Sequence, residues 1–420
     1  MLKKVLFLAL TVAVVVSVSH GSTTRLQTLQ LGGFIKDDSD MFMNPALLAH
    51  YPNLVIGELG VYSDYEYKQE WYCPCQWMAV TAGKGTLTGG LVWNREIPIV
   101  DEIDMFNNME YPFYSPPRPI NPIEAMVSYS NDGMAFGGRA YLAGGGYDYE
   151  EKTDGDVVYE EELGSSVWDF AGGFAMDLGN NSEMDAYVNV GLFSFSGTET
   201  YPDDTLNTEY DCRSEGGKYI EAGGRGFFPV KRGMRMVPLV KFHTGSFTYT
   251  YERDRPDTTW EDDYSRMSLQ LGVGAETQLS RSSMLGAGVS FVYATEKVEW
   301  HDGITDETTH FILPLFQAGL EASLTKWFIA RIGVQKVHAK VTDKWSSESP
   351  GLSGKQDYEW TDTYTDSESL SDFLALGFGI KLDRLLFDAT LREEIPFTGT
   401  YLLSGIARNL SGKITATYHF

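Results

Sequence analysis

Apolar and polar residues alternate with a period of two through most of the chain after about residue 53. The alternation is clearest in four segments, residues 123–130, 168–176, 265–277 and 373–382. In the third segment, Met267 and Leu271 share one face of an extended strand, and Arg266 and Gln270 share the other. Because successive side chains of a strand point to opposite faces, this pattern predicts strands that each have one apolar face.

The connections between these segments alternate between two kinds. Short turn signals occur near residues 84–85, 131–133, 179–181, 280–282, 325–326 and 383–384. Long polar connections occur near residues 96–121, 148–164, 197–216, 252–263, 298–308 and 343–368. Outer-membrane barrels combine short periplasmic turns with long external loops. We therefore predict an all-β fold, a transmembrane antiparallel β-barrel of about 16 strands over residues 53–420, with 14 strands as the alternative.

One predicted strand breaks the alternation. Val237 and Phe247 have the same parity as Lys241, so apolar and charged residues fall on one face. An extra residue in a strand reverses the parity of everything beyond it. A bulge near Gly245 would therefore restore the pattern.

The first residues of the chain predict export. Two lysines are followed by an apolar run over residues 5–18 and then by the small residues Ser19 and Gly21. This layout is typical of a secretory signal peptide over residues 1–21, cut just before Ser22. No later apolar run approaches the ~18 residues of a spanning helix. A mature chain in a membrane must then be a closed barrel, and we expect it in the bacterial outer membrane.

Aromatic residues mark the predicted strand ends. Tyr249 and Tyr251 are expected at the outer membrane–water interface, where amphipathic rings are favoured. In the last segment, residues 412–420, Tyr418 and Phe420 belong to the alternating apolar face. This ending resembles the signal by which the barrel assembly machinery recognises its clients, and we expect that machinery to be a partner.

Composition excludes several classes of function. The formal charge of −25 argues against a nucleic-acid partner. The seven histidines form no zinc-protease or nucleophile pattern, so we predict no enzyme, no metal site and no cofactor. Cys73, Cys75 and Cys212 are too few for a disulfide framework. Cys212 is nevertheless expected to pair with one of the other two in the oxidising export route.

Charged residues at lumen-facing positions are the candidate site residues. Two interpretations are open: the charges fill and solvate the interior, including as pairs across the lumen, or they tune what passes through it. The candidates are Asp169, Asp177, Arg266, Glu276, Arg331 and Arg392.

A short motif precedes the predicted barrel. Asn44-Pro45-Ala46 lies within residues 22–52, and in this position it resembles the Asn-Pro-Ala motif of the FadL-like outer-membrane transporters. The resemblance implies that residues 22–52 form a hatch or plug inside the barrel, here shorter than the hatch of the fatty-acid transporters. It also implies passive transport of small, hydrophobic solutes through a barrel surrounded by outer-membrane lipids. The alternative is a structural or secretion-associated docking barrel of the same shape that transports no solute.

Overall fold

The strands of the barrel form one sheet. The computed structural model describes residues 23–61, 74–95, 120–153, 156–202, 208–254, 257–347, 356–364, 373–391 and 411–420. The predicted signal peptide, Cys73 and Arg392 lie outside the described residues. Within the described ranges the sheet has 17 strands. Their bounds are β1 Leu54–Val61, β2 Pro74–Lys84, β3 Leu87–Trp93, β4 Ile120–Asn131, β5 Met134–Thr153, β6 Asp156–Gly179, β7 Ser182–Tyr201, β8 Thr208–Lys231, β9 Met234–Asp254, β10 Asp257–Ser280, β11 Ser283–Glu299, β12 Ile304–Ser323, β13 Phe328–Ser347, β14 Gln356–Tyr364, β15 Phe373–Leu382, β16 Leu385–Leu391 and β17 Ser411–His419.

Short hairpin turns join the strands at one end of the barrel, which we call the inner end. Asp132 and Gly133, between β4 and β5, have φ angles of 47° and 80°, and Asn180 and Asn181 have 54° and 59°. Two-residue hairpin turns of this kind need positive φ at both central residues, which Asn, Asp and Gly tolerate. The predicted short turns are confirmed at these positions. The structure adds one between β8 and β9, at residues 232–233.

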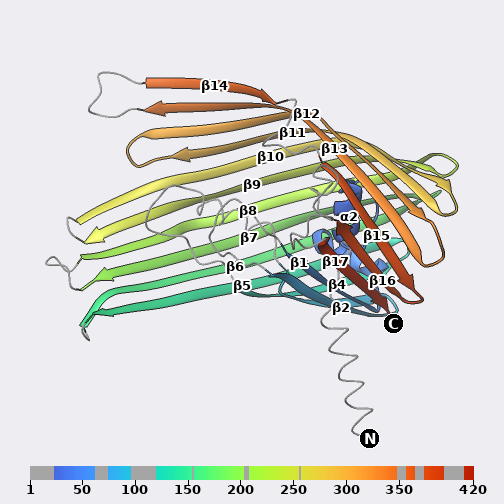
Figure 1. Cartoon of the computed structure of the whole chain (residues 1–420), viewed down its shortest axis with the longest axis horizontal. Coiled ribbons are helices and arrows are strands. Elements are labelled where there is room, and N and C mark those ends of the chain that lie inside the picture. The colour runs from blue at the N-terminus through green and yellow to red at the C-terminus, as the bar shows by residue number, and fades with distance from the viewer. Residues whose placement is uncertain are drawn as a thin grey trace, which may run out of the picture.

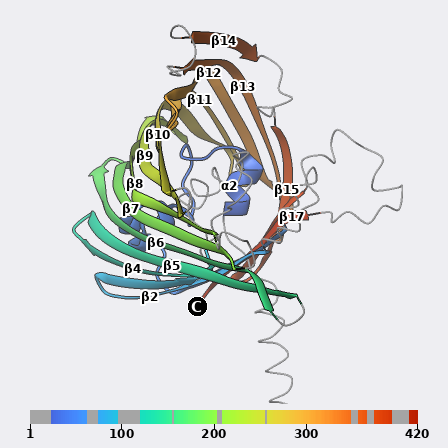
Figure 2. The ribbon, with the colours of Figure 1, turned by 90° about the vertical axis from the view of Figure 1, so that its left-hand side faces the viewer.

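The sheet closes on itself. β17 pairs antiparallel with β1, with Leu54 opposite His419, and Figure 2 shows the resulting ring. Towards the outer end, residues 339–347 of β13 pair with β14, and towards the inner end residues 328–335 pair with β15. β14 and β15 therefore share one position. The ring has 16 positions, so the predicted strand number is confirmed.

Large apolar side chains cover the outside of the ring. Leu91 on β3, Phe170 on β6 and Leu271 on β10 are 47%, 48% and 46% exposed. They alternate with lumen-facing neighbours such as Val92 and Asp169, which are at most 1% exposed. An apolar outer surface suits hydrocarbon. The chain is thus a transmembrane antiparallel β-barrel, as predicted.

Several strands continue far beyond the length that a bilayer needs. β5 to β13 are 17 to 24 residues long, whereas a transmembrane strand needs ~9–11. The long connections predicted at 148–164 and 252–263 are therefore wrong: residues 148–153 and 156–164, and likewise 252–254 and 257–263, are paired strand, with Tyr149 opposite Glu161. Their tyrosine and threonine residues favour strand. Figure 1 shows the resulting wall extending away from the chain's C-terminus.

The predicted bulge near Gly245 is wrong. The pairing of β9 with β10 has no register shift, and the odd-numbered residues of β9 face the lumen. Leu239 there packs at Gly33 of the N-terminal segment, and Phe247 is buried among aromatic rings. A bulge lies instead in β8, whose pairing with β7 shifts near Gly216.

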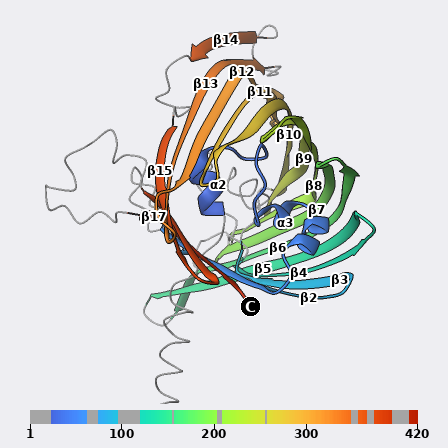
Figure 3. The same ribbon diagram turned by 90° about the vertical axis from the view of Figure 1, so that its right-hand side faces the viewer.

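The N-terminal segment lies inside the ring (Figures 2 and 3). It contains the helix α2 (Thr23–Leu29), the short helix α3 (Asp40–Met43) and the 3-10 helix η1 (Pro45–His50). α2 packs against β12, β13 and β15 to β17, and η1 packs against β3 to β6. Residues 23–53, which we call the plug, therefore connect two separate parts of the wall. No helix of the described ranges is long and apolar enough to cross a membrane.

Candidate functional site

The Asn-Pro-Ala motif starts the helix η1 and attaches it to the wall. Oδ1 of Asn44 accepts a hydrogen bond from the backbone N–H of Ala46 at 3.1 Å, and Pro45 occupies the first turn, where no backbone donor is needed. Nδ2 of Asn44 donates to the carbonyl oxygen of Phe174 at 3.1 Å. Ser128 donates its hydroxyl to the Ala46 carbonyl at 3.0 Å. One side chain thus caps the helix and binds β6.

Glycines in the wall make room for the plug. A Cβ atom at Gly137 of β5 would lie 2.2 Å from the carbonyl carbon of Pro45. At Gly333 of β13 it would lie 2.3 Å from the carbonyl oxygen of Thr28. Real Cβ atoms do not approach backbone this closely, so the plug backbone rests where the wall lacks side chains.

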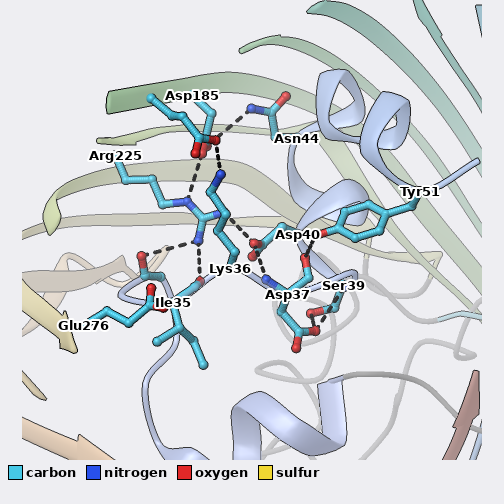
Figure 4. Close-up of polar contacts among 12 residues, drawn as sticks. Ile35, Lys36, Asp37, Ser39, Asp40, Asn44, Tyr51, Asp185, Arg225 and Glu276 are labelled. Carbon is cyan, nitrogen blue, oxygen red and sulfur yellow. Dashed lines mark hydrogen bonds and ion pairs between the residues drawn. The ribbon is translucent and has the colours of Figure 1, made fainter. Parts of the chain in front are cut away.

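Arg225 of β8 binds the middle of the plug (Figure 4). Its guanidinium lies 2.5 Å from Oδ2 of Asp40 and 3.0 Å from Oδ2 of Asp185 on β7. It also donates to the carbonyl oxygen of Ile35 at 3.1 Å. Arg225 and Asp40 are each 7% exposed at their side chains. A buried arginine that binds two carboxylates and a carbonyl oxygen fixes both the position and the orientation of the plug relative to the wall.

A second ionic network binds the α2 end of the plug. Arg25 lies 3.0 Å from Asp37 within the plug and 2.8 Å from Glu321 of β12. Glu321 also lies 2.6 Å from Arg331, which in turn pairs with Asp388 of β16. The network therefore joins the plug to β12, β13 and β16.

Asp38 is an acidic residue of the plug that has no ion-pair partner within the described part of the chain. Its Oδ1 atom is buried without a hydrogen bond. Burial raises the pKa of Asp38, and the neighbouring Asp37 carboxylate raises it further. Asp38 is thus a weak point in the docking of the plug.

Four of the six predicted lumen residues take part in ion pairs. Asp169 is fully buried between Arg139 of β5 and the hydroxyl of Tyr219. Glu276 lies 2.8 Å from Arg235, and the half-buried Arg266 lies 3.3 Å from Glu296. Arg331 belongs to the α2 network.

The other two predicted residues do not join these networks. Asp177 is exposed at the inner end, where it accepts a hydrogen bond from the backbone N–H of Gly179 at 2.8 Å. Arg392 lies outside the described residues. Sequence reasoning also missed the wall residues Arg139 and Arg225. Their signal was available, because both have lumen-facing parity on predicted strands.

The lumen wall on the outer side of the plug is apolar. Phe247 is stacked on Tyr264 at 4.8 Å between ring centroids and lies 5.5 Å from Phe193. We call this group the aromatic wall cluster, and its buried members are Tyr141, Ala143, Val167, Phe193, Phe195, Tyr219, Phe247 and Tyr264. These residues extend from β5 to β10. Water-filled barrels line their interior with polar residues, so the part of the lumen at this cluster differs from theirs.

Further out, aromatic side chains form a continuous band on the same lumen-facing side of the long strands. Neighbouring ring centroids are 4.9 to 6.3 Å apart. We call this band the aromatic row, and its members are Tyr147, Tyr149, Tyr159, Tyr201, Tyr210, Tyr251, Trp260 and His301. Tyr249 contacts Phe195 of the wall cluster. The prediction that Tyr249 and Tyr251 form part of an outward interfacial belt is therefore wrong.

The remaining candidate chemistry is sparse. Cys212 is a free cysteine buried on β8. Its expected partners, Cys73 and the side chain of Cys75, lie outside the described part of the structure. No group of three or more metal-ligating side chains occurs in the described part of the chain. At the closing strand, Phe420 donates its backbone N–H to Asn53 at 3.0 Å, and the Tyr418 side chain is 41% exposed.

Comparison with known proteins gives only distant similarities. No protein-family model matches the chain, and no curated protein matches it either. A FadL homologue of Pseudomonas aeruginosa is 11% identical with a TM-score of 0.39, over 96% of this chain and 98% of that one. The toluene transporter TodX of Pseudomonas putida is 10% identical with a TM-score of 0.37, over 92% and 95%. The transport unit of the Escherichia coli autotransporter AIDA-I is 10% identical with a TM-score of 0.32, over 77% and 97%.

Proposed function

We propose that this chain is an outer-membrane channel that passes a small, hydrophobic solute through its lumen without an energy source. The observation that carries the proposal is the aromatic wall cluster. Its buried rings lie on the lumen side, where apolar surface has no role in contacting lipid. An apolar lining with few polar groups is the usual character of a site for an apolar ligand.

The position of the plug defines the path. A solute that enters from the outer end meets the aromatic wall cluster before it reaches the plug. The buried ion pairs of Arg225 and Arg25 hold the plug in that path. Passage then requires that part of the plug moves or that the solute leaves the lumen before it. In either case the solute binds at the aromatic wall cluster.

Uptake of an apolar dye tests this proposal. Cells whose outer membrane excludes N-phenyl-1-naphthylamine would produce the wild-type chain or the variants F247N and F247L. Placing an amide in the cluster removes apolar contact worth ~1.5–3 kcal/mol, so we expect F247N to slow dye uptake about tenfold or more. Because Leu keeps the surface of the cluster apolar, F247L should retain most of the wild-type dye uptake. Equal uptake by all three, with equal amounts of folded barrel, would overturn the proposal.

A second candidate is a docking barrel. The paired wall of β5 to β13 continues well beyond a bilayer's thickness and favours a binding role outside the membrane. This candidate predicts that dye uptake is the same with and without the chain. Removal of residues 148–164, at the outer ends of β5 and β6, would then leave the barrel folded. It would abolish whatever difference the wild-type chain makes between cells that produce it and cells that do not.

A further inference from the structure

Four side chains of the aromatic row region lie in one line across four strands. Tyr149 of β5 is directly opposite Glu161 of β6, Glu161 is opposite Glu199 of β7, and Glu199 is opposite Tyr210 of β8. All four face the lumen side of the extended wall. Two carboxylates are thus neighbours in the middle of the line, with a tyrosine at each end.

Two further tyrosines hold one of these carboxylates. Tyr159 donates its hydroxyl to Oε1 of Glu199 at 3.0 Å, and Tyr201 donates to Oε2 at 3.1 Å. The rings of Tyr159 and Tyr201 are 5.1 Å apart. Tyr149 and Tyr210 lie 6.0 and 5.9 Å from the nearer of them. Aromatic rings therefore surround the acid pair.

This arrangement carries negative charge that no ion pair within the described part of the chain neutralises. Glu199 is 4% exposed, yet neither it nor Glu161 has an ion-pair partner among the described residues. Like charges directly opposite each other across a sheet are destabilising. The next residue of the line, Arg253, places its guanidinium 5.3 Å over the Tyr210 ring and forms no salt bridge with either glutamate. A ring of the row thus already accepts a cation.

We propose that Glu161, Glu199 and the surrounding tyrosines bind an organic cation through its ammonium group. Tyrosine faces attract a cation within ~6 Å of the ring centre, and the two carboxylates supply the opposite charge. An ammonium ion carrying alkyl groups matches both parts of the site, because its apolar surface contacts rings while its charge offsets the acid pair. This goes beyond the proposed transport of an apolar solute, since equilibrium binding needs no passage.

Calorimetric titration of the full-length barrel in detergent with choline tests the proposal. The neutral carbon isostere 3,3-dimethylbutan-1-ol has the same shape without the charge. We expect saturable choline binding at least tenfold tighter than binding of the isostere. E199Q should weaken choline binding at least tenfold. E161Q, at the more exposed member of the pair, should weaken it several-fold and replaces E199Q if that variant does not fold.

Glu160 provides a matched control. It is adjacent to Glu161 in sequence, but it is exposed on the other face of β6, so E160Q changes the net charge equally and should leave choline binding unchanged. Equal affinities for choline and its isostere would overturn the proposal. So would equal effects of E160Q and E161Q, or saturable binding of Ca²⁺ without any binding of choline.

Discussion

Nη2 of Arg225 in the barrel wall lies 2.5 Å from Oδ2 of Asp40 in the plug. The pair joins residues 185 positions apart in the sequence, and both side chains are nearly inaccessible to water. Removing one member of a buried pair leaves an uncompensated charge, which costs ~3–5 kcal/mol. The docking of the plug therefore depends on this arginine more than on any exposed ion pair.

We expect R225L to lower the free energy of unfolding by ~3–5 kcal/mol and to make the plug accessible to protease. Urea unfolding in detergent, followed by tryptophan fluorescence, gives the first quantity. R213L is the control, because Arg213 pairs with Glu215 and Glu252 while 43% exposed. Exposed pairs contribute ~0–1 kcal/mol. Equal losses in the two variants would show that Arg225 does not anchor the plug.

Two adjacent glycines of β5 allow the contact between wall and plug to be tested separately from the effect of replacing any glycine in the strand. A Cβ atom at Gly137 would lie 2.3 Å from the backbone nitrogen of Ala46, whereas at Gly138 the nearest atom is 4.0 Å away. We expect G137A to displace η1 and to cost ~1–3 kcal/mol, with faster proteolysis of residues 23–53. G138A should unfold like the wild type. A tolerated G137A would mean that η1 moves without loss.

The sequence predicted the barrel better than its interior. Alternation identifies strands with one apolar face, and Leu271 and Asp169 lie on the faces expected of them. Alternation fails at Phe247, because the lumen is itself apolar where the aromatic wall cluster forms. Parity cannot distinguish a ring that faces lipid from one that faces an apolar lumen.

The ionic partners were less predictable for a different reason. Arg25 meets Glu321 across 296 positions of sequence, and such a contact depends on where the plug lies in the closed ring. Asp169 was found because its parity on one strand was sufficient. The parity of Arg139 also places it in the lumen, but its pairing with Asp169 depends on the register between β5 and β6, which sequence alternation leaves undefined.

The raised pKa of Asp38 predicts a pH dependence. Docking of the plug favours the protonated acid, so the docked state loses stability as pH rises from the ordinary value of 3.8 through the raised pKa. D38N removes this loss. We expect D38N to be more stable than the wild type at pH 8 and equal to it below ~pH 4. Unfolding midpoints across this range measure the difference. D37N, which breaks the pair with Arg25, should instead destabilise at pH 8; a destabilising D38N at that pH would contradict the prediction.

The closing strand offers a test of assembly as distinct from stability. The Phe420 side chain is 52% exposed, and the backbone N–H of Phe420 donates to the carbonyl oxygen of Asn53, the residue just before β1. F420A should therefore change the free energy of unfolding of already folded barrel by less than ~0.5 kcal/mol. If the aromatic side chain of Phe420 is the feature that the assembly machinery recognises, the same variant should lower the fraction of heat-modifiable barrel in cells. L382A is the matched control, since Leu382 is 53% exposed at the inner end of β15. A similar fraction of folded barrel in the two variants would remove Phe420 from the assembly signal.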